Sequence, residues 1–425
     1  MRKIRIVILA AVFVVAAGAA ILAVSRFSAN RFVMAAPAGA DDLLRGGLGK
    51  AADGQALSDS ENLRASVAFQ LNLLKASAKD GENAFLSPLS VGIALTMAAN
   101  GAGGETLNAF ENAMGMSLEN MNAFYSAAQE RFNNSAKPTE LNLANAVFFD
   151  KSRVDVSQDF IKSCGGYFAA GLYGMDFSKQ SAVDSINGWA DKNSKGKIPQ
   201  IIDSISPDTL MFLANSVYFN GLWETAFDKK NTYSGAFSAP SGAVQAEYMY
   251  NSELECRCYL GDNVDMAILP YKGDEYSFLA IMPSGDLYDW LQGFTADDYF
   301  GLIGKTYEKE YSIGLPKFEA NFSYDLTEPL ENIGLAAAFD QASADFSKLG
   351  TTQNIGNIYI SDVKHKTYLK VDEEGTTAAA VTIIGLDKAS IVDEIDFHSP
   401  FFYAIIENGT GLPMFMGIMN DPTAQ

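Results

Sequence analysis

One stretch near the carboxyl terminus can form a strand but lacks the features that normally keep a free strand from pairing. Residues 375–386 carry no charge and no proline, and small residues at the start give way to β-branched ones. In an extended conformation one face carries only small side chains, namely Thr376, Ala378, Ala380 and Thr382. Exposed strand-forming segments usually contain charges or proline, and here the first charges are Asp387 and Lys388. The stretch is either an ordinary buried strand or a segment that becomes a strand when a sheet receives it.

The composition indicates a large folded domain with an acidic surface. The chain has 425 residues, of which 48% are hydrophobic and 19% are charged, so a sizeable core is expected and disorder is not. Its net charge is −20, and residues 1–40 contain five basic residues and no acid, so the remainder carries −25. This charge argues against nucleic acid, heparin-like polyanions and anionic membranes as partners.

The first 40 residues have the pattern of an export signal. A basic start is followed by the uncharged, apolar residues 6–24, and Ala38-Gly39-Ala40 provides an A-x-A cleavage site. The apolar run is long for a signal peptide and just long enough to span a bilayer. We therefore expect residues 1–40 to be a signal peptide or a membrane anchor, and favour cleavage. Residues 41–60 are small, polar and glycine-rich, and predict a flexible linker.

No catalytic or metal-binding pattern is present in the sequence. The three cysteines do not form a disulfide framework; Cys256 and Cys258 would point to one face of a strand, and with Cys164 we expect them in or near the core. The chain has two histidines and contains neither G-x-S-x-G nor H-E-x-x-H. No glycine-rich phosphate loop follows a strand. We expect no enzyme, no metal and no cofactor.

Hydrophobic periodicity predicts a mixture of helices and strands. Helices are expected over residues 61–78, 91–99, 105–114, 118–133, 160–170 and 181–195, with a helical pair in 287–305. The helix at 91–99 is apolar on nearly every side, and Ser87 before Pro88 marks its start. Strands are expected over 141–149 and 210–220, followed by short, closely spaced strands in 243–282.

Four motifs, in order along the chain, resemble those of the serpins. They are N-A-F-L-S-P-L-S (83–90), L-A-N-S-V-Y-F-N-G-L-W-E-x-x-F (213–227), L-P-K-F (315–318) and F-H-S-P-F (397–401). The resemblance extends from about residue 60 to the end, with no large insertion. It implies an α+β fold over residues 61–425. That fold has a large, mostly antiparallel central sheet, two smaller sheets, about eight or nine helices and an exposed reactive-centre loop at about 373–396.

The same resemblance implies which residues act. The hinge of the loop corresponds to Glu373, Glu374, Gly375, Thr376, Thr377, Ala378, Ala379 and Ala380. The opening of the main sheet corresponds to Ser87, Ser90, Asn215, His365, Trp223 and Lys317, and Lys317 with Glu373 matches an ion pair at the end of the sheet. Thr377 departs from the family, which usually has Glu there. Because that side chain should stay outside the sheet, we expect little effect.

In function, the resemblance implies a suicide inhibitor of serine proteases, in which the cleaved loop inserts into the main sheet of a metastable fold. Counting from Glu373 and from Phe397 gives the same reactive bond, Ala389–Ser390. A small residue there suits an elastase-like or subtilisin-like protease, whereas a shift to Lys388–Ala389 would suit a trypsin-like one. We expect a secreted monomer, with a membrane tether through residues 6–24 as an alternative. A serpin fold used only for binding, as a chaperone or carrier, is the competing function.

Overall fold

The computed structural model describes residues 36–44, 54–134, 138–168, 171–352, 356–376 and 392–424. Most of the expected export segment therefore lies outside the described residues. Within the described ranges, no helix combines the length and apolar character needed to cross a membrane.

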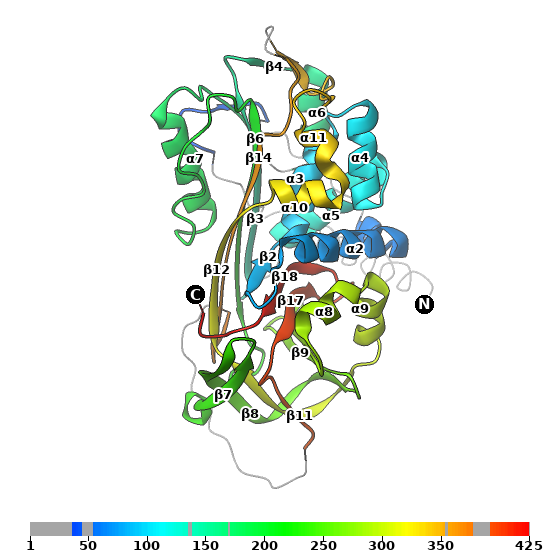
Figure 1. The fold of residues 1–425 in the computed structure, drawn as a ribbon, viewed down its shortest axis with the longest axis vertical. Coiled ribbons are helices and arrows are strands. Elements are labelled where there is room, and N and C mark those ends of the chain that lie inside the picture. The colour runs from blue at the N-terminus through cyan, green and yellow to red at the C-terminus, as the bar shows by residue number, and fades with distance from the viewer. Residues whose placement is uncertain are drawn as a thin grey trace, which may run out of the picture. The chain divides into compact units, whose positions relative to one another are not determined.

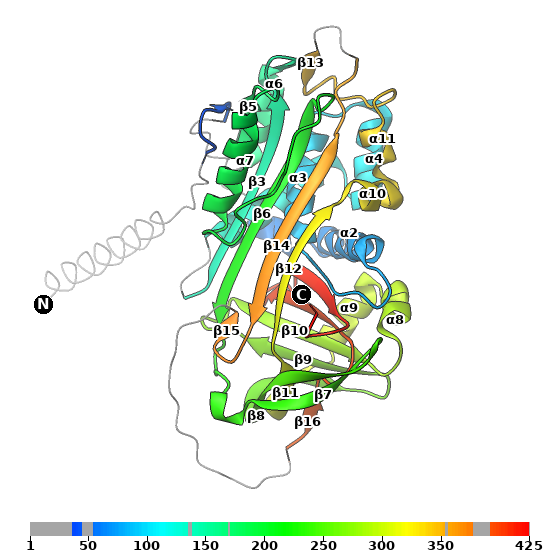
Figure 2. The ribbon, with the colours of Figure 1, turned by 60° about the vertical axis from the view of Figure 1, so that its left-hand side comes forward.

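A central mixed sheet forms the frame of the domain (Figure 2). Its order is β1 (Asp41–Asp42), β5 (Gly171–Met175), β3 (Glu140–Asp150), β6 (Met211–Leu222), β14 (Asp362–Val371) and β12 (Phe318–Asp325). The pairs β3–β5 and β6–β14 are parallel and the other three are antiparallel. A two-residue strand, β15 (Gly375–Thr376), pairs with β6 outside this order.

A second hydrogen-bonded set of nine strands supplies the two smaller sheets, which share the long strand β8. The strands are β2 (Ala84–Leu86), β7 (Tyr233–Ala239), β8 (Gly242–Leu260), β9 (Val264–Pro270), β10 (Tyr276–Pro283), β11 (Tyr307–Pro316), β16 (Glu394–Asp396), β17 (Phe401–Glu407) and β18 (Pro413–Met419). A separate ribbon joins β4 (Val154–Val156) to β13 (Gly350–Thr352). The α+β serpin fold expected from the sequence is confirmed.

The helices lie mainly on one side of the central sheet (Figure 1). They are η1 (Gly54–Ser58), α2 (Ser60–Ser77), α3 (Pro88–Ala99), α4 (Gly104–Met114), α5 (Leu118–Asn133), α6 (Gln158–Tyr167), α7 (Gln180–Asn193), η2 (Lys229–Asn231), α8 (Leu287–Gly293), α9 (Ala296–Ile303), α10 (Thr327–Leu330), η3 (Glu331–Leu335) and α11 (Ala336–Phe339). Every residue of α3 is buried, as its all-round apolar sequence predicts. Ser87 caps this helix by accepting a hydrogen bond from the Ser90 N–H, and Pro88 occupies its first turn.

The two faces of the central sheet pack against different helices. On β6, Phe212 and Ala214 belong to a core with Trp189 of α7. Leu213 and Val217 point the other way, into the main core that contains α3. Alternation along β6 therefore sends even-numbered side chains toward α7 and odd-numbered ones toward α3.

The described parts of the expected flexible linker, residues 41–44 and 54–60, contact the rest of the domain, and residues 45–53 lie outside the described part of the chain. Asp41 and Asp42 pair with Gly174 and Tyr173 at the edge of the central sheet, and Asp41 accepts an ion pair from Lys151 at 2.8 Å. Leu57 in η1 is buried against the main core. The glycine-rich composition concealed these contacts, because an exposed sheet edge offers backbone groups that any sequence can pair with.

Helix α6 is shorter than expected, and the three cysteines lie where they were expected. Helix α6 ends at Tyr167 rather than at residue 170, because Phe168 takes an extended backbone conformation. Cys164, Cys256 and Cys258 are free and buried, and the sulfurs of Cys256 and Cys258 lie 3.6 Å apart on one face of β8. The interpretation of these cysteines as core residues is confirmed.

Candidate functional site

The two central strands of the main sheet separate at one end. Strands β6 and β14 pair in parallel from Phe212–Asp362 to Tyr218–Tyr368. Beyond Tyr368, β14 continues to pair with β12 as far as Val371, and β6 continues beside β3 as far as Asn220. The strands remain in the sheet but are no longer partners of each other, so a gap opens between them at this end.

The start of the expected loop lies in that gap. After β14 the chain turns at residues 372–374 and returns as β15, where Gly375 pairs with Leu222 and Thr376 with Gly221, antiparallel to β6. The backbone N–H groups of Trp223 and Phe227 donate to the carbonyl oxygens of Glu374 and Glu373 at 3.1 and 2.9 Å. The described part of the loop therefore forms two strand pairs with β6, at the end where β6 and β14 are no longer partners.

Only glycine fits at residue 375. Its φ is +145°, and a Cβ at this position would lie 2.2 Å from the Gly221 carbonyl oxygen. Any side chain would push β15 away from β6, so Gly375 permits the close approach that begins the pairing.

Thr376 is fully buried beneath an aromatic cover. Its Oγ1 is 2.7 Å from the Tyr271 hydroxyl, and the Trp223 ring stacks on Tyr271 with centroids 4.8 Å apart. Trp223 Nε1 donates to the Asp372 carbonyl at 2.8 Å, which ties the cover to the turn. Burial raises the pKa of Tyr271, so its hydroxyl stays protonated and able to donate. The sequence analysis identified Trp223 but missed Tyr271, which directly follows β9 among the short strands expected in 243–282.

Ion pairs hold the turn that precedes β15. Lys317 Nζ is 2.9 Å from a Glu373 carboxylate oxygen, which also accepts from Thr232 Oγ1 at 2.7 Å. Burial favours the neutral carboxyl, but the hydrogen bonds from Lys317 and Thr232 outweigh it, and the pKa of Glu373 lies below its ordinary value. Glu374 pairs with Lys229, whose side chain is 62% exposed. The expected Lys317–Glu373 pair is thus formed, and its carboxylate is buried.

A buried polar cluster lies under the closed part of the sheet. Ser87, Ser90, Asn215 and His365, which the sequence grouped together, are all at most 1% exposed. The Ser87 N–H donates to His365 Nε2 at 2.9 Å, and Asn215 Nδ2 donates to the Ser90 carbonyl at 3.3 Å. Asn215 and His365 are direct partners across the β6–β14 ladder. Burial lowers the pKa of His365 to about 3, so the ring is neutral near pH 7.

Asn145 on β3 completes this cluster and was missed from the sequence. Its Oδ1 accepts from Ser90 Oγ at 2.7 Å and from Asn215 Nδ2 at 2.6 Å. Asn145 also pairs with Asn215 across the β3–β6 ladder. The only signal was an asparagine within the otherwise apolar residues 143–149 of a predicted strand, where a polar side chain needs a buried partner.

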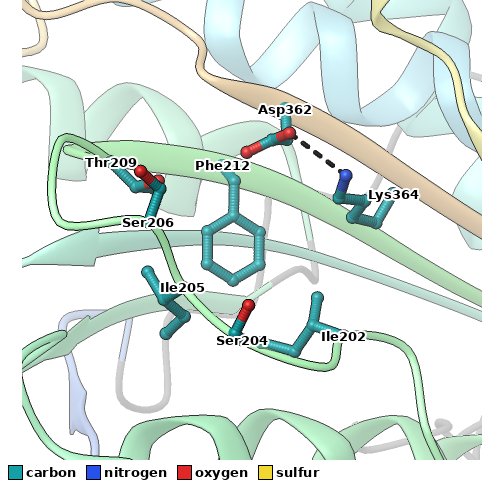
Figure 3. A pocket seen from close by; sticks show the side chains of 8 residues that line it. All are labelled: Ile202, Ser204, Ile205, Ser206, Thr209, Phe212, Asp362 and Lys364. Carbon is teal, nitrogen blue, oxygen red and sulfur yellow. Dashed lines mark hydrogen bonds and ion pairs between the residues drawn. The ribbon is translucent and has the colours of Figure 1, made fainter.

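At the end where β6 and β14 begin to pair, the loop of residues 202–209 lies against the sheet. Figure 3 shows the Phe212 ring between this loop and the Asp362–Lys364 ion pair. Lys364 Nζ is 3.1 Å from Asp362 and 2.7 Å from Asp325. The cavity here is about 20 Å³, which is room for about one water molecule.

Several predicted residues lie outside the described part of the chain. They are Thr377, Ala378, Ala379 and Ala380 of the hinge and Lys388, Ala389 and Ser390 around the reactive bond. Within the described ranges, no group of three or more His, Cys, Asp or Glu side chains could hold a metal ion.

Comparison with known proteins agrees with this architecture. A family model described as Serpin (serine protease inhibitor) matches residues 64–422. Serpin B6 of Pongo abelii is 31% identical over 378 residues, with 84% of this chain and 98% of that protein covered. The native-state crystal structure of Tengpin, a thermophilic serpin, is 32% identical, has a TM-score of 0.82 and covers 90% of this chain and 99% of its own. Tengpin in the latent state gives a lower TM-score of 0.74, covering 85% and 98%.

The chain belongs to the serpin family. Members of this family are in general protease inhibitors rather than enzymes, and some are non-inhibitory carriers.

Proposed function

We propose that this protein is a suicide-substrate inhibitor of serine proteases that traps its target by inserting the cleaved loop into the central sheet. The observation that carries the proposal is the position of Gly375 and Thr376. They already pair with β6 in the direction an inserted strand needs, and the one buried side chain is small.

The parallel arrangement of β6 and β14 supports insertion. An antiparallel strand placed between them would gain a ladder on each side, while only seven registered residue pairs between β6 and β14 would be lost. The residues that follow Thr376 are small and uncharged through Ala380, so little desolvation opposes their entry. Insertion therefore offers a net gain of hydrogen bonds that the native form lacks.

The chemistry is a competition between two fates of one acyl-enzyme. The protease serine oxygen attacks the Ala389 carbonyl carbon, and the peptide bond to Ser390 breaks, with the Ser390 nitrogen leaving as a protonated amine. Water can then hydrolyse the ester and release an active protease. If the loop inserts first, it carries the bound protease away from its starting position before the ester is hydrolysed.

The target class and cellular location follow from sequence alone. A small residue at Ala389 favours an elastase-like or subtilisin-like serine protease, and use of Lys388 instead would favour a trypsin-like one. The pattern of residues 1–40 favours export with cleavage, so the inhibitor would act outside the cytoplasm.

The decisive experiment is to incubate residues 41–425 with pancreatic elastase and, separately, with trypsin. Denaturing gels and intact mass should show a covalent complex that survives SDS, with release of a peptide beginning at Ser390. A released peptide beginning at Ala389 would move the reactive bond to Lys388. Clean cleavage with no complex and no gain in thermal stability would contradict inhibition and favour a binding-only serpin, such as a chaperone or carrier.

A further inference from the structure

Two thiols that the proposed function does not use lie side by side on β8. The sulfurs of Cys256 and Cys258 are 3.6 Å apart on one face of the strand, and the two residues are 2% and 0% exposed. The hydrogen bond between the two side chains, together with burial, raises the pKa of Cys258, so this sulfur is a neutral thiol near pH 7. The pair is therefore a buried dithiol within one strand.

The backbone geometry opposes closure of this pair to a disulfide. Alternate Cα atoms of an extended strand are about 6.4–6.8 Å apart, at the upper limit of the distance that a disulfide spans. The sulfurs would also have to approach to about 2.05 Å, which would shorten the strand. The ladders on both sides resist this change, because Cys258 pairs with Tyr307 of β11 and with Ala267 of β9.

A third atom placed between the sulfurs needs no such movement. At a bond length of about 2.3 Å to each sulfur, the 3.6 Å separation corresponds to an angle of about 100° at the bridging atom. A linear two-coordinate ion would need the sulfurs about 4.6 Å apart at the same bond length. Zinc accepts a bent angle but needs four ligands, and within the described residues no cluster of three His, Cys, Asp or Glu side chains could supply them.

Trivalent arsenic meets the requirements that this geometry sets. It forms three single bonds in a pyramid whose bond angles are close to the angle between the two sulfurs. As a soft centre it prefers sulfur ligands to oxygen ligands. Because it keeps one substituent of its own, two protein sulfurs complete its coordination and no further protein ligand is needed.

The dithiol is covered by side chains that can move while the backbone stays in place. Residues directly opposite in an antiparallel ladder project to the same face, so Lys309 lies on the face of Cys256. Tyr307 lies opposite Cys258 in the same way. The Lys309 side chain is 39% exposed where it pairs with Asp393, and Tyr307 is 52% exposed. Rotation of these two side chains would open a path to the sulfurs and leave the ladder intact.

We propose that Cys256 and Cys258 form a chelating site for a trivalent arsenical. Two As–S bonds replace the two As–O bonds of an acid R–As(OH)2, and the two thiol protons leave with the hydroxyl groups as two molecules of water. Arsenic stays trivalent and both sulfurs keep their oxidation state, so no oxidant or reductant takes part. The site does not depend on loop insertion, so its failure would leave the proposed function untouched.

The test uses phenylarsine oxide, whose hydrated form is R–As(OH)2 with a phenyl group. The full-length chain is mixed with one equivalent, and its intact mass is measured without denaturation. We expect one phenylarsenic group per chain, with the loss of two protein hydrogens. Cys256→Ala and Cys258→Ala should each lower the affinity by about 100-fold or more, because chelation by two sulfurs becomes a single As–S bond. Cys164→Ala is the matched control, since it removes the third buried thiol and should bind as the wild type does.

Two measurements on the wild type keep the test independent of how well the variants fold. Excess mercaptoethanol should leave the adduct intact and ethanedithiol should remove it, because only the dithiol offers two sulfurs to one arsenic. Unfolding should also shift to a higher guanidinium chloride concentration with the probe bound. A probe held by the folded strand stabilises the protein, whereas one that captures only unfolded chains destabilises it.

Any of several results would overturn the site. They are the absence of an adduct, wild-type affinity in Cys258→Ala, removal of the adduct by mercaptoethanol, and a lower unfolding midpoint with the probe. Formation of a Cys256–Cys258 disulfide in the folded chain on mild oxidation with hydrogen peroxide would overturn the geometric argument from the strand.

Discussion

The β15 end of the central sheet and its middle differ in whether β6 and β14 are paired and in whether the buried polar groups have hydrogen-bond partners. At the β15 end the strands β6 and β14 are already apart, and Thr376 fills the space with its hydroxyl bonded to Tyr271. In the middle the strands are joined by seven registered pairs, but three polar atoms of the cluster beneath them have no hydrogen-bond partner within the described part of the chain. At the β15 end the strands are unpaired with each other and the buried Thr376 hydroxyl has a partner. In the middle the strands are paired, and some buried polar atoms have no partner among the described residues.

This difference suggests how a stable fold can be prepared for a large rearrangement. The proposed insertion would begin where β6 and β14 are already apart, beside the two pairs that β15 makes with β6. Only further along would the seven pairs between β6 and β14 have to separate.

The largest effect should come from blocking the open end. Thr376→Arg would bring a guanidinium into a fully buried position, and about 1.4 kcal/mol added to the insertion barrier slows insertion tenfold. We expect the protease to cleave this variant as a substrate and escape. Titration of protease activity against inhibitor concentration measures the stoichiometry.

Thr377→Arg is the matched control for that variant. Alternation along an inserted strand would place residues 376 and 377 on opposite faces, and Asn220, the next residue of β6 in the register of β15, is half-buried. An unchanged stoichiometry in Thr376→Arg would sink the insertion mechanism.

The second-largest effect should come from lowering the pH, which should reduce the free energy of unfolding through the buried His365. Burial lowers the pKa of His365 from 6.5 to about 3, so between these values the unfolded chain binds a proton that the folded chain does not. The contribution of His365 to stability is complete above pH 6.5 and is lost as the pH falls toward 3, by up to about 1.4 kcal/mol per pH unit. Urea unfolding between pH 7 and 5 should show this slope.

His365→Gln should remove most of that pH dependence, because an amide oxygen can accept from the Ser87 N–H without titrating. His398→Gln changes the other, exposed histidine and should keep the slope. Equal slopes in all three proteins would mean that His365 is not the group responsible.

Two neighbouring carboxylates, Glu373 and Glu374, allow the ion pairs that hold the turn before β15 to be tested. Glu373→Gln removes the negative charge of a buried carboxylate that pairs with Lys317. We expect the free energy of unfolding to fall by about 1–3 kcal/mol. Glu374→Gln affects a pair with the exposed Lys229, and should cost no more than about 1 kcal/mol. Urea unfolding at pH 7 compares the two, and equal losses would show that burial of Glu373 adds nothing.

The smallest effect should come from the hydroxyl that holds Thr376. Tyr271→Phe keeps the stack on Trp223 but removes the 2.7 Å hydrogen bond, at about 1 kcal/mol. Hydrogen exchange at the Thr376 amide should become faster. Tyr403→Phe is a control in the same core, because the Tyr403 hydroxyl has no partner among the described residues and its loss should be nearly neutral.

Local sequence patterns predicted the elements of this protein well but not the contacts that complete the site. The all-apolar run before Asn100 predicted the buried helix α3, and the apolar residues 210–220 predicted the central strand β6. Motif resemblance grouped Ser87, Ser90, Asn215 and His365. Neither approach found Asn145 or Tyr271, because both residues lie outside the four motifs and their partners are more than 50 residues away along the chain.

The sequence by itself determined the family, the helices and strands, and a loop segment whose small, uncharged residues permit insertion. Tertiary structure alone decided where β6 and β14 separate, that Gly375 and Thr376 pair with β6 there, and which polar atoms the cluster brings together. Periodicity and composition depend on neighbours along the chain. Strand separation and the satisfaction of buried hydrogen bonds depend on residues that only the folded chain brings together.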